Sequence, residues 1–157
     1  MKEPKLERYQ RIYQQLADLF IKTKDPVSRM ATMVAVLHHK LDNYYWTGFY
    51  RLIDEELVVG PYQGFLACLL LKQHTGVCWA AVDRKESVIV GDVNQFPGHI
   101  ACDSRSRSEI TVPVFDAEGR VRAVLDVDSS EYDSFDEKDA QGLEKIVSLI
   151  YQKASNV

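Results

Sequence analysis

The feature that most constrains the fold is a change in the spacing of apolar residues near Tyr44. Before it, residues 5–22 and 26–41 carry apolar side chains three and four positions apart, which is typical of amphipathic helices. Asp25 and Pro26 supply an N-cap and a first-turn proline for the second helix. After Tyr44 the spacing changes to the alternation and short apolar runs of β-strands. This order predicts an α+β fold, with helices packed on one face of an antiparallel sheet and loops on the other.

The part of the chain after Tyr44 is predicted to contain about six strands, one short helix and a final helix. The apolar run at 65–72 is expected to be a strand buried on both faces. Ser134 and Glu137 are predicted to form the capping box of the final helix. The other expected elements are a hairpin of 45–53 and 57–62, a short helix at 77–82, a strand at 87–90, and a hairpin of 109–115 and 120–128.

Length and charge limit the class of protein. The chain has 157 residues, which is the size of one domain, and its net charge of -4 gives no sign of nucleic-acid or membrane binding. No run approaches the ~20 apolar residues of a membrane span, and the charged start at Met1–Lys5 does not resemble a signal peptide. The 3 cysteines do not form an even, dense disulfide framework, so we expect a cytoplasmic protein with reactive thiols.

The connection at 92–109 is predicted to be a functional loop, because long loops inside small domains are usually functional or disordered. Phe96, Ile100 and Cys102 give it apolar anchors, which argues against disorder. The nearby cations make Cys102 a candidate nucleophile, since positive charge stabilises a thiolate. These cations are His99, Arg105 and Arg107, and Asp103 opposes them. Cys68 and Cys78, taken alone, are expected to be small buried apolar residues.

The second hairpin brings acidic residues together in either of two registers. If Asp116–Gly119 is a four-residue loop, Glu109 lies opposite Asp126; a slip of two residues places it opposite Asp128. Asp126 and Asp128 share one face of their strand because side chains alternate. Crowded carboxylates raise one another's pKa, so the cluster is predicted to bind an ammonium group, to act as a general acid, or both.

A metal site is a further alternative, although the sequence gives it little support. The candidate ligands are Cys68, His74, Cys78, His99 and Cys102. Their spacings lack the short Cys-x-x-Cys pairs of structural zinc sites. Nothing in the chain resembles a phosphate loop or a dinucleotide fingerprint. We therefore predict no metal and no cofactor.

Several motifs resemble those of the free methionine-(R)-sulfoxide reductases, which are stand-alone GAF domains. The longest match is residues 92–103 followed by 108–110, and shorter matches lie at Trp46–Tyr50, Gly60–Gly64, Gly76–Cys78 and Val124–Ser129. The resemblance implies one GAF domain over residues 1–157 with a six-stranded antiparallel sheet. Within it, 1–42 would be the helical part, 44–132 the sheet and loops, and 134–154 the last helix. Members of this family are often homodimers.

The resemblance also implies a reaction: thiol-dependent reduction of free L-methionine-(R)-sulfoxide to L-methionine. Cys102 would be the nucleophile and become a sulfenic acid, Cys68 would be the resolving thiol, and Cys78 an auxiliary thiol. The resulting intramolecular disulfide would be reduced by a thioredoxin-like dithiol. The implied substrate-binding residues are Glu109, Asp126 and Asp128, with Trp46 and Tyr50 as walls around the substrate methyl group.

A GAF domain that binds a small molecule without chemistry is the competing hypothesis. The 3 thiols argue against it. The segment around Cys78 argues for it, because Trp79 stands where the family has a glycine, and Gln73-His74 replace an aromatic-glycine pair. These substitutions bear on the shape of the pocket and on the role of Cys78.

Overall fold

The centre of the molecule is a six-stranded antiparallel sheet with the strand order β3-β2-β1-β6-β5-β4. The structure is a computed structural model that describes residues 3–99 and 104–153. The strands are β1 (Trp46–Ile53), β2 (Glu56–Gln63), β3 (Leu70–Leu71), β4 (Val88–Val90), β5 (Ser108–Phe115) and β6 (Val121–Ser129). The α-helices are α1 (Lys5–Leu19), α2 (Pro26–Lys40), α3 (Gly76–Arg84) and α4 (Glu137–Val147).

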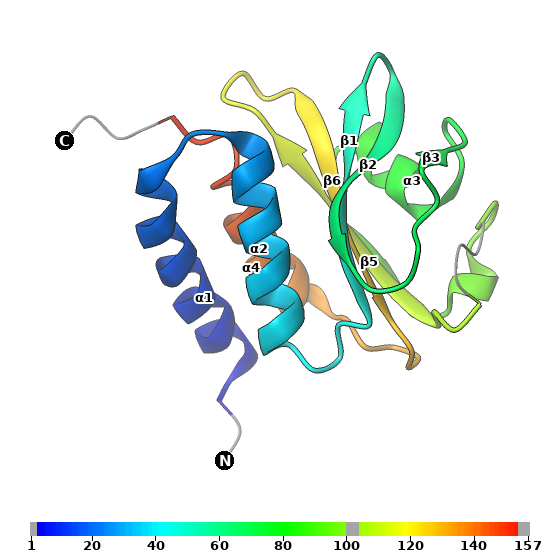
Figure 1. Ribbon diagram of the computed structural model, residues 1–157. Coiled ribbons are helices and arrows are strands. Elements are labelled where there is room, and N and C mark those ends of the chain that lie inside the picture. The colour runs from blue at the N-terminus through cyan, green and yellow to red at the C-terminus, as the bar shows by residue number, and fades with distance from the viewer. Residues whose placement is uncertain (1–2, 100–103, 154–157) are drawn as a thin grey trace.

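The sheet is covered on both faces, as Figure 1 shows, with α1, α2 and α4 on one face and α3 on the other. Residues alternate between two cores: Phe49 and Leu125 face the three long helices, whereas Tyr50 and Val124 face α3. The predicted α+β fold with the N- and C-terminal helices on one face is confirmed. No helix within the described ranges has the length and apolar character needed to cross a membrane.

The starts of α2 and α4 are set by side-chain caps. Asp25 accepts a hydrogen bond from the Ser28 N–H at 2.8 Å, as the sequence predicts for the start of α2. The prediction for the final helix is wrong in its bounds. Asp136, and not Ser134, is the cap, because its carboxylate accepts from the N–H groups of Lys138 and Asp139. The Ser134 hydroxyl instead donates to Ser129 Oγ at 2.6 Å.

The prediction of a doubly buried strand at 65–72 is wrong. Only Leu70–Leu71 pairs with β2, and Leu66 in this segment is 87% exposed. Two backbone carbonyls in this segment accept from side chains instead of from a neighbouring strand. Trp46 Nε1 donates to the Phe65 carbonyl at 2.9 Å, and the Tyr50 hydroxyl donates to the Cys68 carbonyl at 3.2 Å. An apolar run alone does not reveal such bonds and therefore predicts a strand.

The hairpin of β5 and β6 adopts the slipped register of the two that were predicted. Glu109 lies opposite Asp128, and Thr111 lies opposite Asp126. The expected pairing of Phe115 with Arg120 is wrong, because an irregularity beyond Val114 pairs Phe115 with Val121. Both carboxylate-bearing positions of β6 still point to the face that α3 covers.

Candidate active site

A pocket of about 110 Å³ lies on the α3 face of the sheet, between the β5–β6 hairpin, α3 and the loop before β3. Each predicted site residue within the described ranges lines it, whereas Cys102 lies outside those residues. The predicted residues that line the pocket are Trp46, Tyr50, Cys68, Cys78, Glu109, Asp126 and Asp128. The chain thus brings together, from five segments, groups that are far apart in sequence.

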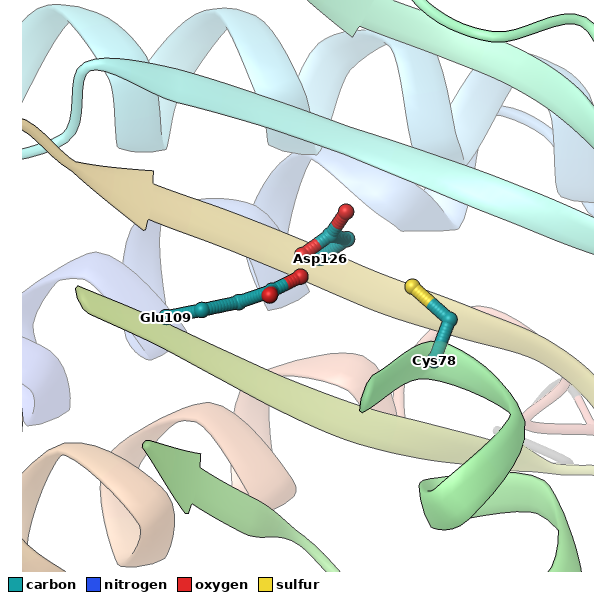
Figure 2. A group of neighbouring side chains, drawn as sticks. All are labelled: Cys78, Glu109 and Asp126. Carbon is teal, nitrogen blue, oxygen red and sulfur yellow. The ribbon is translucent and has the colours of Figure 1, made fainter. Parts of the chain in front are cut away.

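The carboxylates of Glu109 and Asp126 form the floor of this pocket and point toward each other, as Figure 2 shows. Glu109 is 4% exposed and Asp126 is 7% exposed, while Asp128 is half-buried. β5 and β6 are neighbours, so the two strands present all three groups on one face. Within the described part of the chain, Glu109 Oε1 and Asp126 Oδ1 have no hydrogen-bond partner. Buried polar atoms without a partner are unusual in a folded protein and point to a functional site.

Burial makes the two carboxyl groups hold protons more strongly than usual. Desolvation raises the pKa of Glu109 well above its ordinary value, and the negative charges of Asp126 and Asp128 raise it further. Burial also raises the pKa of Asp126, although hydrogen bonds with Glu109 and Cys78 oppose that shift. The pair is consequently suited to hold and donate a proton near neutral pH, as the sequence predicted for crowded carboxylates.

Cys78 lies in the first turn of α3 and points its sulfur at the two carboxyl groups (Figure 2). It is a free cysteine and is 5% exposed. Burial raises the pKa of this thiol well above its ordinary value, and the facing Asp126 and Glu109 raise it further. Cys78 therefore remains a protonated thiol at neutral pH, which is the poorly nucleophilic form.

The three groups Cys78, Glu109 and Asp126 are also the described residues that best fit a metal ion. Their potential ligand atoms lie within 4.8 Å of one another, and all three residues are buried. Each of these ligand groups has a raised pKa, so a cation would have to displace protons to bind. The ligand set considered from the sequence is not the one assembled, because His74 does not line the pocket and pairs with Asp83 at 3.0 Å.

Trp46 and Tyr50 form an aromatic wall along one side of the pocket. Their rings are stacked with centroids 6.0 Å apart, and Trp46 also stacks on Tyr62 at 5.3 Å. Two glycines make room for the indole. A Cβ at Gly48 would lie 2.6 Å from the Trp46 ring, and one at Gly64 would lie 2.7 Å from it. Larger residues at either position would displace the wall.

Cys68 lies beside this aromatic wall, in the loop between β2 and β3. It is partly buried and takes part in a disulfide, in contrast to the free thiol of Cys78. The hydrogen bonds from Trp46 and Tyr50 hold the loop that carries it. The two described cysteines thus differ in redox state as well as in burial.

The sequence did not identify every residue of the pocket. Lys72 lines it and is the only Lys or Arg among the described lining residues, which makes it able to pair with a ligand carboxylate. His99 also lines it, with a buried Nε2 that has no partner among the described groups and with a pKa lowered by burial. Trp79 is buried against His74 and does not itself line the pocket.

Comparison with known proteins assigns the chain to a family. A GAF domain model matches residues 24–152. GAF domain-containing protein A of Dictyostelium discoideum is 39% identical over 150 residues, covering 95% of this chain and 94% of that protein. Free methionine-R-sulfoxide reductase of Escherichia coli is 40% identical over 124 residues, covering 79% of this chain and 74% of the relative.

A solved structure agrees in both fold and sequence. Free methionine-R-sulfoxide reductase from Neisseria meningitidis, in complex with its substrate, superposes with a TM-score of 0.90 at 38% identity and covers 96% of this chain and 90% of that one. The match extends over the sheet, the helices and the pocket-bearing segments. The chain therefore belongs to the GAF domain family and, within it, to the free methionine-R-sulfoxide reductases, which are oxidoreductases.

Proposed function

We propose that this protein reduces free L-methionine-(R)-sulfoxide to L-methionine at the pocket on the α3 face. The observation that carries the proposal is the proton-holding pair of Glu109 and Asp126, which faces the same pocket as the disulfide-bonded Cys68. A sulfoxide reductase needs such a combination, because the departing oxygen must be protonated while a thiol supplies the electrons. The relatives named as free methionine-R-sulfoxide reductases support the choice of substrate.

In the proposed reaction, Cys102 supplies the attacking thiolate. It attacks the sulfoxide sulfur while the Glu109–Asp126 pair protonates the oxygen. The hydroxyl group then passes from the substrate sulfur to the Cys102 sulfur as the new S–S bond breaks, so methionine leaves and Cys102 becomes a sulfenic acid. The Cys68 thiol then attacks the Cys102 sulfur, which forms the disulfide and releases water. Cys78 is less suited to either step, because its buried thiol has a raised pKa.

The pocket also fits the other groups of a free amino acid. The buried carboxyl groups of Glu109 and Asp126, together with Asp128, suit an ammonium group. The exposed Lys72 suits the carboxylate, and the wall of Trp46 and Tyr50 suits the substrate methyl group. A methionine sulfoxide within a peptide has neither charged group, so we expect preference for the free amino acid.

The test is consumption of NADPH in a coupled assay with thioredoxin, thioredoxin reductase and free methionine-(R)-sulfoxide. Wild-type protein should turn over, and Cys102→Ser should lose at least about 10³-fold in kcat, as expected when a covalent nucleophile is removed. Cys68→Ser should complete one turnover and then stop, because no resolving thiol remains. Cys78→Ser should retain most of its activity.

The same assay separates an enzyme from a GAF domain that only binds a ligand. A binding module would show heat of binding with methionine sulfoxide in calorimetry but no NADPH consumption in the wild type. Persistent turnover in Cys102→Ser would contradict the assignment of the nucleophile. A stop after one turnover in Cys78→Ser, with normal activity in Cys68→Ser, would exchange the roles of those two cysteines.

A further inference from the structure

Exposed apolar side chains flank Cys68 in the loop before β3, and two of them, Leu66 and Leu70, also line the pocket. We call Phe65, Leu66, Leu69 and Leu70 the loop patch. Leu66 is 87% exposed and Leu69 is 73% exposed, and the other two residues are also exposed. No other stretch of similar length in the described ranges leaves as many large apolar side chains open to solvent. Large apolar side chains gathered in one exposed segment are typical of an interaction site.

The loop patch is a preformed surface. The Phe65 carbonyl accepts from Trp46, the Cys68 carbonyl accepts from Tyr50, and the Leu69 carbonyl accepts from the Val59 N–H at 3.0 Å. The Phe65 ring also stacks on Tyr45 with centroids 4.9 Å apart, and the Arg105 guanidinium lies 3.4 Å from its centroid. A surface fixed in this way loses little conformational entropy when a partner binds.

Cys68 lies in the middle of this patch and takes part in a disulfide. We propose that the loop patch is the docking surface for a protein dithiol reductant of the thioredoxin type, an inference that rests on the proposed function. The thiolate of that protein would attack Cys68 Sγ, forming a mixed disulfide and releasing the other cysteine of the pair as a thiolate. The second thiol of the reductant then attacks its own first sulfur. This step releases the Cys68 thiolate and leaves the reductant oxidised.

The size of the loop patch favours this occupant over a second copy of the chain. Obligate homodimers bury large, strongly apolar interfaces, whereas transient redox encounters use small ones of less than ~1,200 Å² in total. Four apolar side chains around one sulfur match the smaller class. A thiolate must also reach the disulfide sulfur directly, so any protein that reduces Cys68 contacts Leu66 and Leu69, its exposed neighbours on either side.

The experiment measures disulfide reduction directly and needs no turnover. Protein oxidised with one equivalent of hydrogen peroxide is mixed with thioredoxin or with dithiothreitol, and alkylation with mass spectrometry follows the appearance of the Cys68 thiol. The double variant Leu66→Ser/Leu69→Ser should lower the rate constant for reduction by thioredoxin about tenfold, because a few anchoring side chains carry most of the binding energy of an interface. Its rate constant for dithiothreitol should equal that of the wild type.

Ile21→Ser is the matched control, because Ile21 is 81% exposed and lies after α1, on the helical side of the molecule. It should leave both rate constants unchanged. An equal thioredoxin rate for the patch variant, or an equal loss in Ile21→Ser, would overturn the proposal. The proposal would also be overturned if analytical ultracentrifugation showed a dimer that the substitutions in the loop patch dissociate. Normal disulfide reduction without turnover of methionine sulfoxide would instead overturn only the proposed function.

Discussion

At the scale of single residues, the pocket depends on two buried carboxyl groups, Glu109 and Asp126, from neighbouring strands. Burial raises the pKa of both groups, and Lys72 and His99 line the same pocket. Like charges at close range destabilise a fold when both are ionised. A functional site tolerates this cost because a proton held at neutral pH is the one that the proposed reaction consumes.

The raised pKa of Glu109 predicts a pH-dependent loss of stability. Between the ordinary pKa of an unfolded glutamate, about 4.3, and the raised native pKa, the native state holds a proton that the unfolded state has released. Stability from this group is therefore fully present below the unfolded pKa and falls as pH rises toward the native pKa. Glu109→Gln removes the titration, so its urea midpoint should fall less from pH 5 to pH 8 than that of the wild type.

Urea titrations of both proteins across this pH range test the prediction. Glu144→Gln serves as the control for loss of one carboxylate, because Glu144 is exposed on α4. Parallel midpoint profiles for Glu109→Gln and the wild type would contradict the raised pKa.

At the scale of elements, the contact between α1 and α4 is set by a glycine. Gly142 is buried in α4, and a Cβ at this position would lie 2.4 Å from the Tyr9 ring of α1. Tyr9 cannot move away easily, because its hydroxyl is hydrogen-bonded to both Tyr44 and Asp139. The close packing of these two helices therefore requires the absence of a side chain at Gly142.

Gly142→Ala should destabilise the protein even though alanine is the better helix former. The propensity gain is about 1 kcal/mol, whereas overpacking a fixed contact costs about 1–3 kcal/mol. We expect a net loss of about 1 kcal/mol in the free energy of unfolding by urea denaturation. Gln141→Ala, at the exposed neighbouring position of the same helix, should be neutral or slightly stabilising. A gain in stability for Gly142→Ala would show that the helices can separate at little cost.

At the scale of the whole molecule, one buried arginine joins the two ends of the chain. Arg29 in α2 is 5% exposed and donates to the Phe20 and Thr23 carbonyls before the helix. It also donates to the carbonyls of Leu149 and Ile150, at the end of the described chain. The N-terminal helices and the segment after α4 are thus tied together through a single side chain.

Arg29→Met should lower the free energy of unfolding by about 3 kcal/mol, because several buried carbonyls lose a charged donor together. The measurement is urea unfolding, and catalytic parameters of the folded variant should stay close to those of the wild type because Arg29 lies on the far face of the sheet. Arg11→Met is the control, since Arg11 pairs with Glu3 on the surface. It should cost less than about 1 kcal/mol. Equal losses in the two variants would mean that the carbonyls find other partners.

The β5–β6 hairpin shows which features of the site the sequence predicts and which it does not. Alternation along a strand placed Asp126 and Asp128 on one face and Glu109 against them in either register. The register that forms goes with the pairing of Phe115 with Val121 and with the irregularity beyond Val114, and side-chain alternation predicts neither. The convergence of the carboxylates was predictable, and their partners across the strands were not.

The sequence by itself determined the α+β class, the two N-terminal helices, the carboxylate cluster and the family. These features follow from local periodicity, capping residues and contiguous motifs, which are readable along one chain. Only the tertiary structure decided that residues 65–70 form an exposed patch, that Trp79 packs away from the pocket, and that Lys72 enters it. Each depends on side chains from distant segments, such as Trp46 binding the Phe65 carbonyl, and such contacts exist only once the sheet has formed.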